Sequence, residues 1–133
     1  MASRGIRGAT TIETDTKENV LSATRELLEI ICESNPDLKT ENIASAIFTV
    51  TEDIVSAFPA FAARQIGWDQ IPMICTREIP VPESLPRCIR VLIHWNTEKE
   101  QKDIRHVYLH AAKELRPDLS HKPELKEEEG EKQ

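Results

Sequence analysis

The longest apolar run of the chain, residues 88–95 (CIRVLIHW), most limits how the chain can fold. Its length and its branched residues predict a strand, and its nearly continuous hydrophobicity predicts a central strand that is buried on both faces. Arg90 interrupts the run. Because a buried guanidinium is stable only when it is paired, a negative group must face it. That group is either a bound anion or a carboxylate of the chain, such as Glu78 or Glu13, unless the arginine reaches out to the sheet edge.

The rest of the pattern predicts further strands at 4–13, 43–51, 71–75 and 104–111, and helices at 16–34 and 59–66. Asp15 stands three residues before Glu18, as in a capping box, and Pro59 and Gly67 suit the first turn and the end of the second helix. Three prolines predict an irregular loop over 78–86. This order of elements predicts an α+β fold, a mixed β-sheet with helices on one face.

Length and composition limit the class of protein. A chain of 133 residues suits one domain, which we place at 1–121. Residues 122–133 hold five glutamates, three lysines and few apolar residues, so we expect a disordered acidic tail. The net charge of −6 disfavours a nucleic-acid partner, and no apolar run is long enough to cross a membrane.

The cysteines and the N-terminal residues indicate a location in the cytoplasm. The chain has three cysteines, an odd number without C-x-x-C spacing, so reduced thiols are expected instead of disulfides or a zinc site. Residues 1–7 lack the apolar segment of a signal peptide.

Arg7 is a second candidate for binding an anion. It stands in the first predicted strand between Gly5 and Gly8, two residues that allow a ligand or another backbone to come close. Two strand arginines on one sheet, Arg7 and Arg90, could converge on one ligand. The alternative is a surface arginine on an edge strand.

Cys75 and Glu78 flank the place where a predicted strand enters the proline-rich loop, a common position for site residues. Glu78 could accept a hydrogen bond from a hydroxyl group, and Cys75 could donate a weak one. The alternatives are a solvated glutamate and a cysteine buried as a small apolar residue.

Tyr108 shares one face of the last predicted strand with His106 and His110, and its phenol could donate to a carboxylate. The alternative is a half-buried core tyrosine. Histidines four apart on a strand are too distant to share a metal ion, so no metal site is expected. The sequence also has no G-x-S-x-G elbow and no phosphate-binding loop.

Several separated segments, taken together, resemble the monofunctional AroH-type chorismate mutases in order and spacing. They are residues 4–11 (RGIRGATT), 58–60 (FPA) with Arg64, 67–68 (GW), 88–91 (CIRV), 104–109 (IRHVYL) and 115–119 (LRPDL). The resemblance extends from about residue 4 to residue 120 and excludes only the acidic tail.

This resemblance implies a homotrimer with a pseudo-α/β-barrel core and active sites in the clefts between subunits. It also implies the conversion of chorismate to prephenate, in phenylalanine and tyrosine biosynthesis, without a cofactor. The positions that match catalytic residues of the family are Arg7, Cys75, Glu78, Arg90 and Tyr108. Further positions that match substrate contacts are Ile74, Thr76 and Arg77, with Phe58, Arg64 and Arg116 flanking the site.

The roles implied by the resemblance suit an intramolecular rearrangement, which needs no nucleophile. Arg90 would stabilise the negative charge that grows on the ether oxygen, because a guanidinium stays charged when it is buried. Arg7 and Tyr108 would hold carboxylates, while Glu78 and Cys75 would bind the ring hydroxyl. The chain departs from some members at Phe61, where they carry lysine.

Two other interpretations of the function remain: a trimeric binding module for a small carboxylate, and an enamine or imine deaminase of similar shape.

Overall fold

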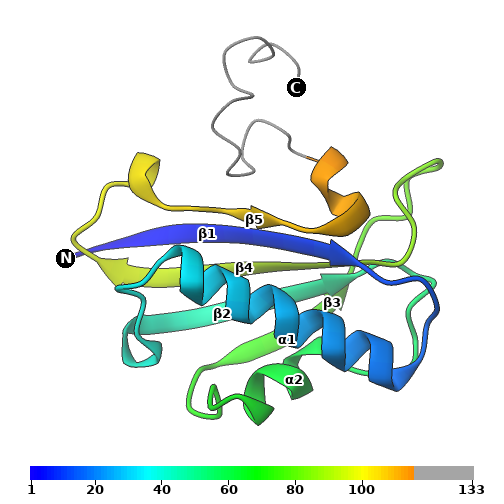
Figure 1. Cartoon of the computed structure of the whole chain (residues 1–133), viewed down its shortest axis with the longest axis horizontal. Helices are drawn as coiled ribbons and strands as arrows, with labels where there is room; N and C mark the ends of the chain where they lie inside the picture. The colour runs from blue at the N-terminus through cyan, green and yellow to red at the C-terminus, as the bar shows by residue number, and fades with distance from the viewer. Residues whose placement is uncertain (116–133) are drawn as a thin grey trace, which may run out of the picture.

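Five strands form one mixed sheet in the computed structural model, which describes residues 1–115 (Figure 1). The order across the sheet is β3-β2-β4-β1-β5. The central strand β4 is antiparallel to both neighbours, whereas β1 and β5 are parallel, as are β2 and β3. The strands are β1 Ala2–Thr11, β2 Ile43–Val50, β3 Met73–Arg77, β4 Cys88–Thr97 and β5 Val107–Tyr108. The predicted α+β class is therefore confirmed.

Two α-helices, α1 Lys17–Ser34 and α2 Pro59–Gln65, agree with the predicted ones. The cap of α1 differs from the prediction: Thr16 accepts a hydrogen bond from the Asn19 backbone at 3.0 Å, whereas Asp15 accepts bonds from Val55 and Ser56. Pro59 starts α2 as predicted. Gly67 follows its last turn with φ of 99°, a backbone conformation that favours glycine.

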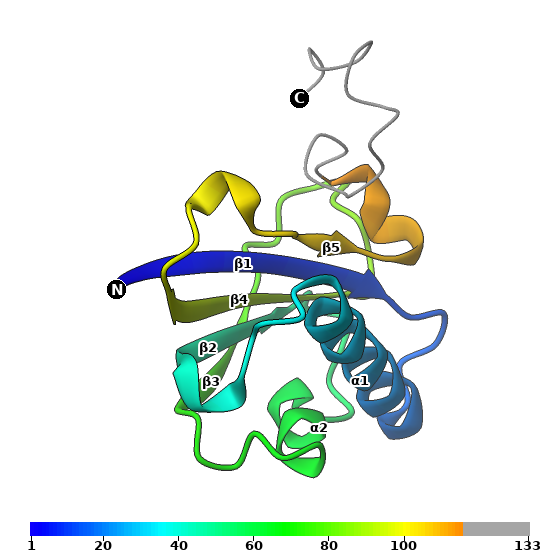
Figure 2. The ribbon, with the colours of Figure 1, turned by 60° about the vertical axis from the view of Figure 1, so that its left-hand side comes forward.

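The helices pack on one face of the sheet, and this side holds the main core (Figure 2). Gly8 marks the closest approach: a Cβ atom there would lie 2.7 Å from Ile31 Cδ1 of α1. Gly8 pairs with Val91 of β4, which in turn pairs with Phe48 of β2, and both Val91 and Phe48 are buried beneath the helices. The alternate residues of the same strands therefore point to the opposite face, which we call the open face.

Each predicted strand has other limits in the structure. The strand predicted at 4–13 is β1, which lies two residues earlier, and those predicted at 43–51 and 88–95 are β2 and β4, whose last residues differ by one and two positions. The strand predicted at 71–75 is β3, shifted two residues along the chain because its pairing with β2 continues to Arg77. Cys75 therefore lies in the middle of a strand. The strand predicted at 104–111 is reduced to two residues, since the Asn35 side chain binds both the backbone N–H and the backbone C=O of Arg105.

A 3₁₀ helix, His110–Glu114, follows β5 and ends the predicted alternation. His110 has φ of 55° and its Nε2 lies 3.1 Å from Glu26 Oε1, so it does not continue the face of Tyr108. The two other 3₁₀ turns are Thr40–Asn42 and Gln101–Asp103. The predicted acidic tail and Arg116 lie outside the described residues.

Candidate active site

Arg90 lies near the start of β4, on the open face. Its register partners are Ala9 of β1 and Thr49 of β2. Its side chain is 47% exposed in the single chain. The prediction that β4 is buried on both faces was therefore wrong for the chain alone, because alternate residues such as Ile89, Val91 and Ile93 are buried on the helix side, whereas Arg90 and Leu92 on the open face are exposed.

Glu78 is the anion that faces Arg90 within the chain. Its Oε2 lies 3.4 Å from Arg90 Nε and also accepts a hydrogen bond from the Thr49 hydroxyl. The Glu78 backbone N–H donates to the Val50 carbonyl oxygen at 2.9 Å, which fixes the residue just beyond the end of β3. Of the alternatives left open by the sequence, the structure contains the internal ion pair with Glu78. This ion pair lies where the bound anion was predicted.

Arg7 and Tyr108 complete this group on neighbouring strands. Arg7 pairs with Leu92 across β1 and β4, and Tyr108 pairs with Ala9 across β5 and β1. Tyr108 is nearly buried and packs with Ala9 and Ala112. The imidazole of His106 helps to hold β1, since its Nδ1 accepts the Arg7 backbone N–H at 2.9 Å.

These four side chains line one cavity of 440 Å³, which we call the arginine cavity. Its charged lining residues are Arg7, Arg90 and Glu78. Thr49, Ile47 and Leu92 also line it and were not among the predicted site residues. A signal for Thr49 was present, because the period of two along the second strand places Thr49 on the same face as Ser45.

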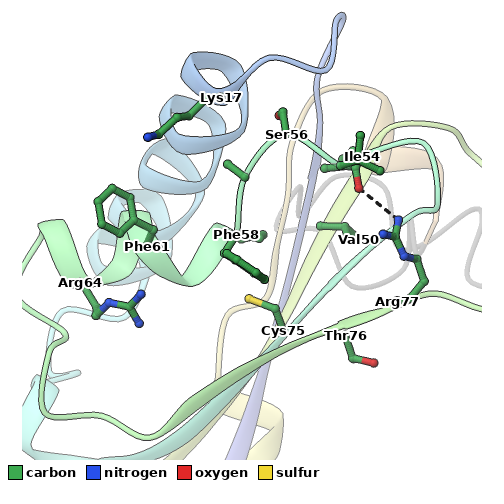
Figure 3. A pocket seen from close by; sticks show the side chains of 13 residues that line it. Lys17, Val50, Ile54, Ser56, Phe58, Phe61, Arg64, Cys75, Thr76 and Arg77 are labelled. Carbon is green, nitrogen blue, oxygen red and sulfur yellow. Dashed lines mark hydrogen bonds between the residues drawn. The ribbon is translucent and has the colours of Figure 1, made fainter.

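Most other predicted site residues line a second hollow of 740 Å³ between β3, α2 and the start of α1, which we call the helix cavity (Figure 3). Cys75 pairs in register with Phe48, a residue buried beneath the helices, whereas Thr49 and Arg90 point to the open face. A single chain therefore does not bring Cys75 and Glu78 to one cavity. The predicted residues in the helix cavity are Phe58, Arg64, Cys75, Thr76 and Arg77.

Cys75 is held as a neutral thiol. Burial raises the pKa of the Cys75 thiol above its ordinary value, and this effect outweighs a backbone hydrogen bond from Ala60 and the positive charge of Arg64, which lower it. A protonated thiol can donate a weak hydrogen bond but is a poor nucleophile. The site is thus suited to binding through Cys75 and not to attack by it.

Two predicted contacts are not placed in either cavity. The Ile74 side chain is 61% exposed in the single chain and lines neither hollow. Arg116 lies outside the described residues. Within residues 1–115, no group of three or more His, Cys, Asp or Glu side chains could hold a metal ion, and no helix is long and apolar enough to cross a membrane.

Comparisons with known proteins identify the family of the chain. The family model for chorismate mutase type I matches residues 3–119. The chain is 59% identical over 116 residues to a chorismate mutase AroH of Thermus thermophilus, covering 87% of this chain and 95% of that protein. It is 46% identical over 121 residues to a chorismate mutase AroH of Bacillus subtilis, covering 90% and 94%. A solved chorismate mutase from Clostridium thermocellum superimposes with a TM-score of 0.80 at 50% identity, covering 82% and 96%. The chain belongs to the chorismate mutase type I family.

Proposed function

We propose that this chain rearranges chorismate to prephenate at a composite site, built where the arginine cavity of one copy meets the helix cavity of the next in a homotrimer. The activity follows from the family: the chain is a chorismate mutase, an isomerase of aromatic amino acid biosynthesis. The observation that carries the composite site is the division of the matched residues between two cavities of the single chain.

The charges of the two cavities support this division. Chorismate carries two carboxylates, but the arginine cavity offers two arginines and one carboxylate, and one of these arginines, Arg90, is already paired with Glu78. The helix cavity contributes the further cations Lys17, Arg64 and Arg77, and among residues 1–115 no carboxylate lines it. A dianion is matched better by both cavities together than by either one.

Exposed apolar side chains near both cavities support an assembly of several copies. Leu92 lies on the open face, Ile79 and Val81 lie in the loop after Glu78, and Phe58 lies beside the helix cavity. All four are exposed in the single chain. Apolar patches of this kind are typical of surfaces that another subunit covers.

The chemistry assigned to each residue follows from what an intramolecular rearrangement requires. The enzyme must select the compact conformer and stabilise negative charge on the ether oxygen as the C–O bond breaks. Arg90 meets that need, because its ion pair with Glu78 aims a fixed fork of donors into the cavity. Arg7 and Tyr108 hold carboxylates, while Glu78 and the Cys75 thiol of the neighbouring copy bind the ring hydroxyl.

The thiols support a location in the cytosol as part of the same proposal. Cys32, Cys75 and Cys88 are all free, as expected in a reducing compartment.

An ultraviolet assay that follows the loss of chorismate tests the activity. We expect turnover without any added metal or cofactor, and sedimentation equilibrium should give three times the mass of one chain. A binding module would bind chorismate without consuming it, and a deaminase would release ammonia from an enamine or imine substrate instead. Either result, with chorismate left unchanged, would contradict the proposed function.

A further inference from the structure

Lys17, a residue that the family motifs did not single out, stacks with Phe61 and Arg64 at the helix cavity. The Lys17 ammonium lies 5.7 Å from the centre of the Phe61 ring, and the Arg64 guanidinium carbon lies 5.9 Å from it. In the view of Figure 3 the ring lies between the two cations. Both distances suit cation–π attraction, so the ring of α2 holds a lysine of α1 beside the cavity.

Local helix stability does not explain a cation at position 17. Lys17 is the first residue of α1, directly after the N-cap Thr16. The dipole of a helix disfavours positive charge at this end and favours a carboxylate, such as that of the next residue, Glu18. The Lys17 charge therefore opposes the helix that carries it.

No carboxylate of the described residues compensates the Lys17 charge. Within residues 1–115, the ion pairs of the chain do not include Lys17, and the lining of the helix cavity contains no acid. Asp15, two residues earlier, is bound to the Val55 backbone and the Ser56 hydroxyl. Arg77, the third cation of the cavity, donates to the carbonyl oxygens of Thr51 and Ile54.

We propose that Lys17 is a substrate-positioning residue, which together with Arg64 attracts a carboxylate of the dianionic substrate into the composite site. This inference rests on the proposed function. Phe61 holds the lysine side chain near the cavity, so less freedom is lost when the anion arrives. Lys17 is exposed at the helix cavity and is not one of the residues that we assign to the ether oxygen or the ring hydroxyl, so it acts on binding and not on the rearrangement itself.

The test compares Lys17→Ala and Lys17→Glu with Lys39→Ala and Lys39→Glu. Lys39 is an exposed lysine beyond the other end of α1, so each control makes the same change in net charge. Steady-state kinetics on chorismate should show KM raised about three- to tenfold by Lys17→Ala and more by Lys17→Glu, with kcat within about twofold. Lys17→Arg should keep KM near that of the wild type.

Two further readouts separate attraction of the substrate from a structural role. The rise in KM should shrink as salt is added, because salt screens exposed charges. The melting temperature of Lys17→Glu should equal or exceed that of the wild type, since the helix dipole favours an acid at this position. A structural role would instead lower the melting temperature and leave the salt dependence unchanged.

The inference would be overturned if Lys17→Ala gave the same KM as Lys39→Ala, or if its KM defect persisted undiminished at high salt. Either outcome, obtained with a wild-type enzyme that consumes chorismate, leaves the proposed function intact. If the wild-type enzyme left chorismate unchanged, the proposed function itself would fail.

Discussion

The two faces of the sheet use the same strands for different purposes. On the face covered by the helices, Ile89, Val91 and Ile93 of β4 are buried among apolar neighbours. On the open face, the alternate residues Arg90 and Leu92 remain exposed in the single chain. The period of two in a strand thus separates residues that stabilise the fold from residues that we propose face the substrate. Substitutions on the two faces should therefore have different consequences.

The largest effect on turnover is expected for Arg90→Ala. Removing one well-placed electrostatic donor lowers kcat by about 10² to 10³, whereas a half-exposed ion pair contributes little to folding. Chorismate absorbance measures the first effect and circular dichroism the second. Arg105→Ala, an exposed arginine outside both cavities, serves as the control. If Arg90→Ala turned over chorismate as fast as the wild type, the assignment of the active site to the open face would be wrong.

The opposite result is expected for Ile93→Ala, three residues along the same strand. Its side chain is completely buried, so the cavity left behind should lower the free energy of unfolding by about 2–5 kcal/mol. The kcat of the molecules that remain folded should stay unchanged. Urea denaturation measures the free energy of unfolding, and chorismate turnover, divided by the fraction of molecules that are folded, gives the kcat. A loss of kcat without a loss of stability would show that the two faces are not independent.

A smaller loss of turnover is expected for Glu78→Ala, about 10- to 100-fold in kcat, since it removes one hydrogen-bonding partner of the substrate and leaves the Arg90 charge in place. Thr49→Val is the matched control, because it removes the hydroxyl that donates to Glu78 and keeps the carboxylate. Its kcat should fall less. An unchanged kcat in Glu78→Ala would show that Glu78 is not part of the site, and the assignment of Arg90 would still stand.

A modest pH effect is expected on the covered side, at Cys32 of α1. Burial, together with the charges of Glu29 and Glu33, raises the pKa of this thiol above its ordinary value of 9.0. The unfolded chain therefore loses this proton more readily, and the free energy of unfolding should fall as the pH rises above about 9. Urea denaturation at pH 8 and pH 10 should show a smaller fall in Cys32→Ala. An identical fall in both proteins would contradict this account of Cys32.

The smallest effect is expected when the acidic segment 122–133 is removed. Its composition suits neither a core nor a binding site for a dianion, so kcat should remain within about twofold of the wild type. The same chorismate assay measures it. A large drop would assign this segment a part in the site.

Much of the fold could be predicted from periodicity, because each helix and each strand except the last carries its own pattern. The last strand could not, since its length depends on Asn35, a residue 70 positions away that binds both backbone groups of Arg105. The burial of β4 was overestimated for a related reason. An apolar run such as residues 88–95 does not distinguish a face covered by helices from a face that the single chain leaves open.

The site could be predicted only in part. Arg90 stands out in its apolar run, and the motifs at Arg7, Glu78 and Tyr108 follow from the resemblance to the family. Nothing in the sequence places Lys17 beside Phe61, because their contact depends on how α1 and α2 pack. The division of the matched residues between two cavities is likewise a property of the folded chain.

Mixing two inactive variants tests the composite site most directly. Arg90→Ala leaves the lining of the helix cavity intact, and the double variant Arg64→Ala with Cys75→Ala leaves the lining of the arginine cavity intact. The two proteins are unfolded, mixed in equal amounts and refolded together. If each site combines cavities of two copies, random assembly leaves about one quarter of the sites intact, and chorismate turnover should return to about that fraction of the wild type. Turnover no higher than the mean of the two variants would show that each site lies within one chain.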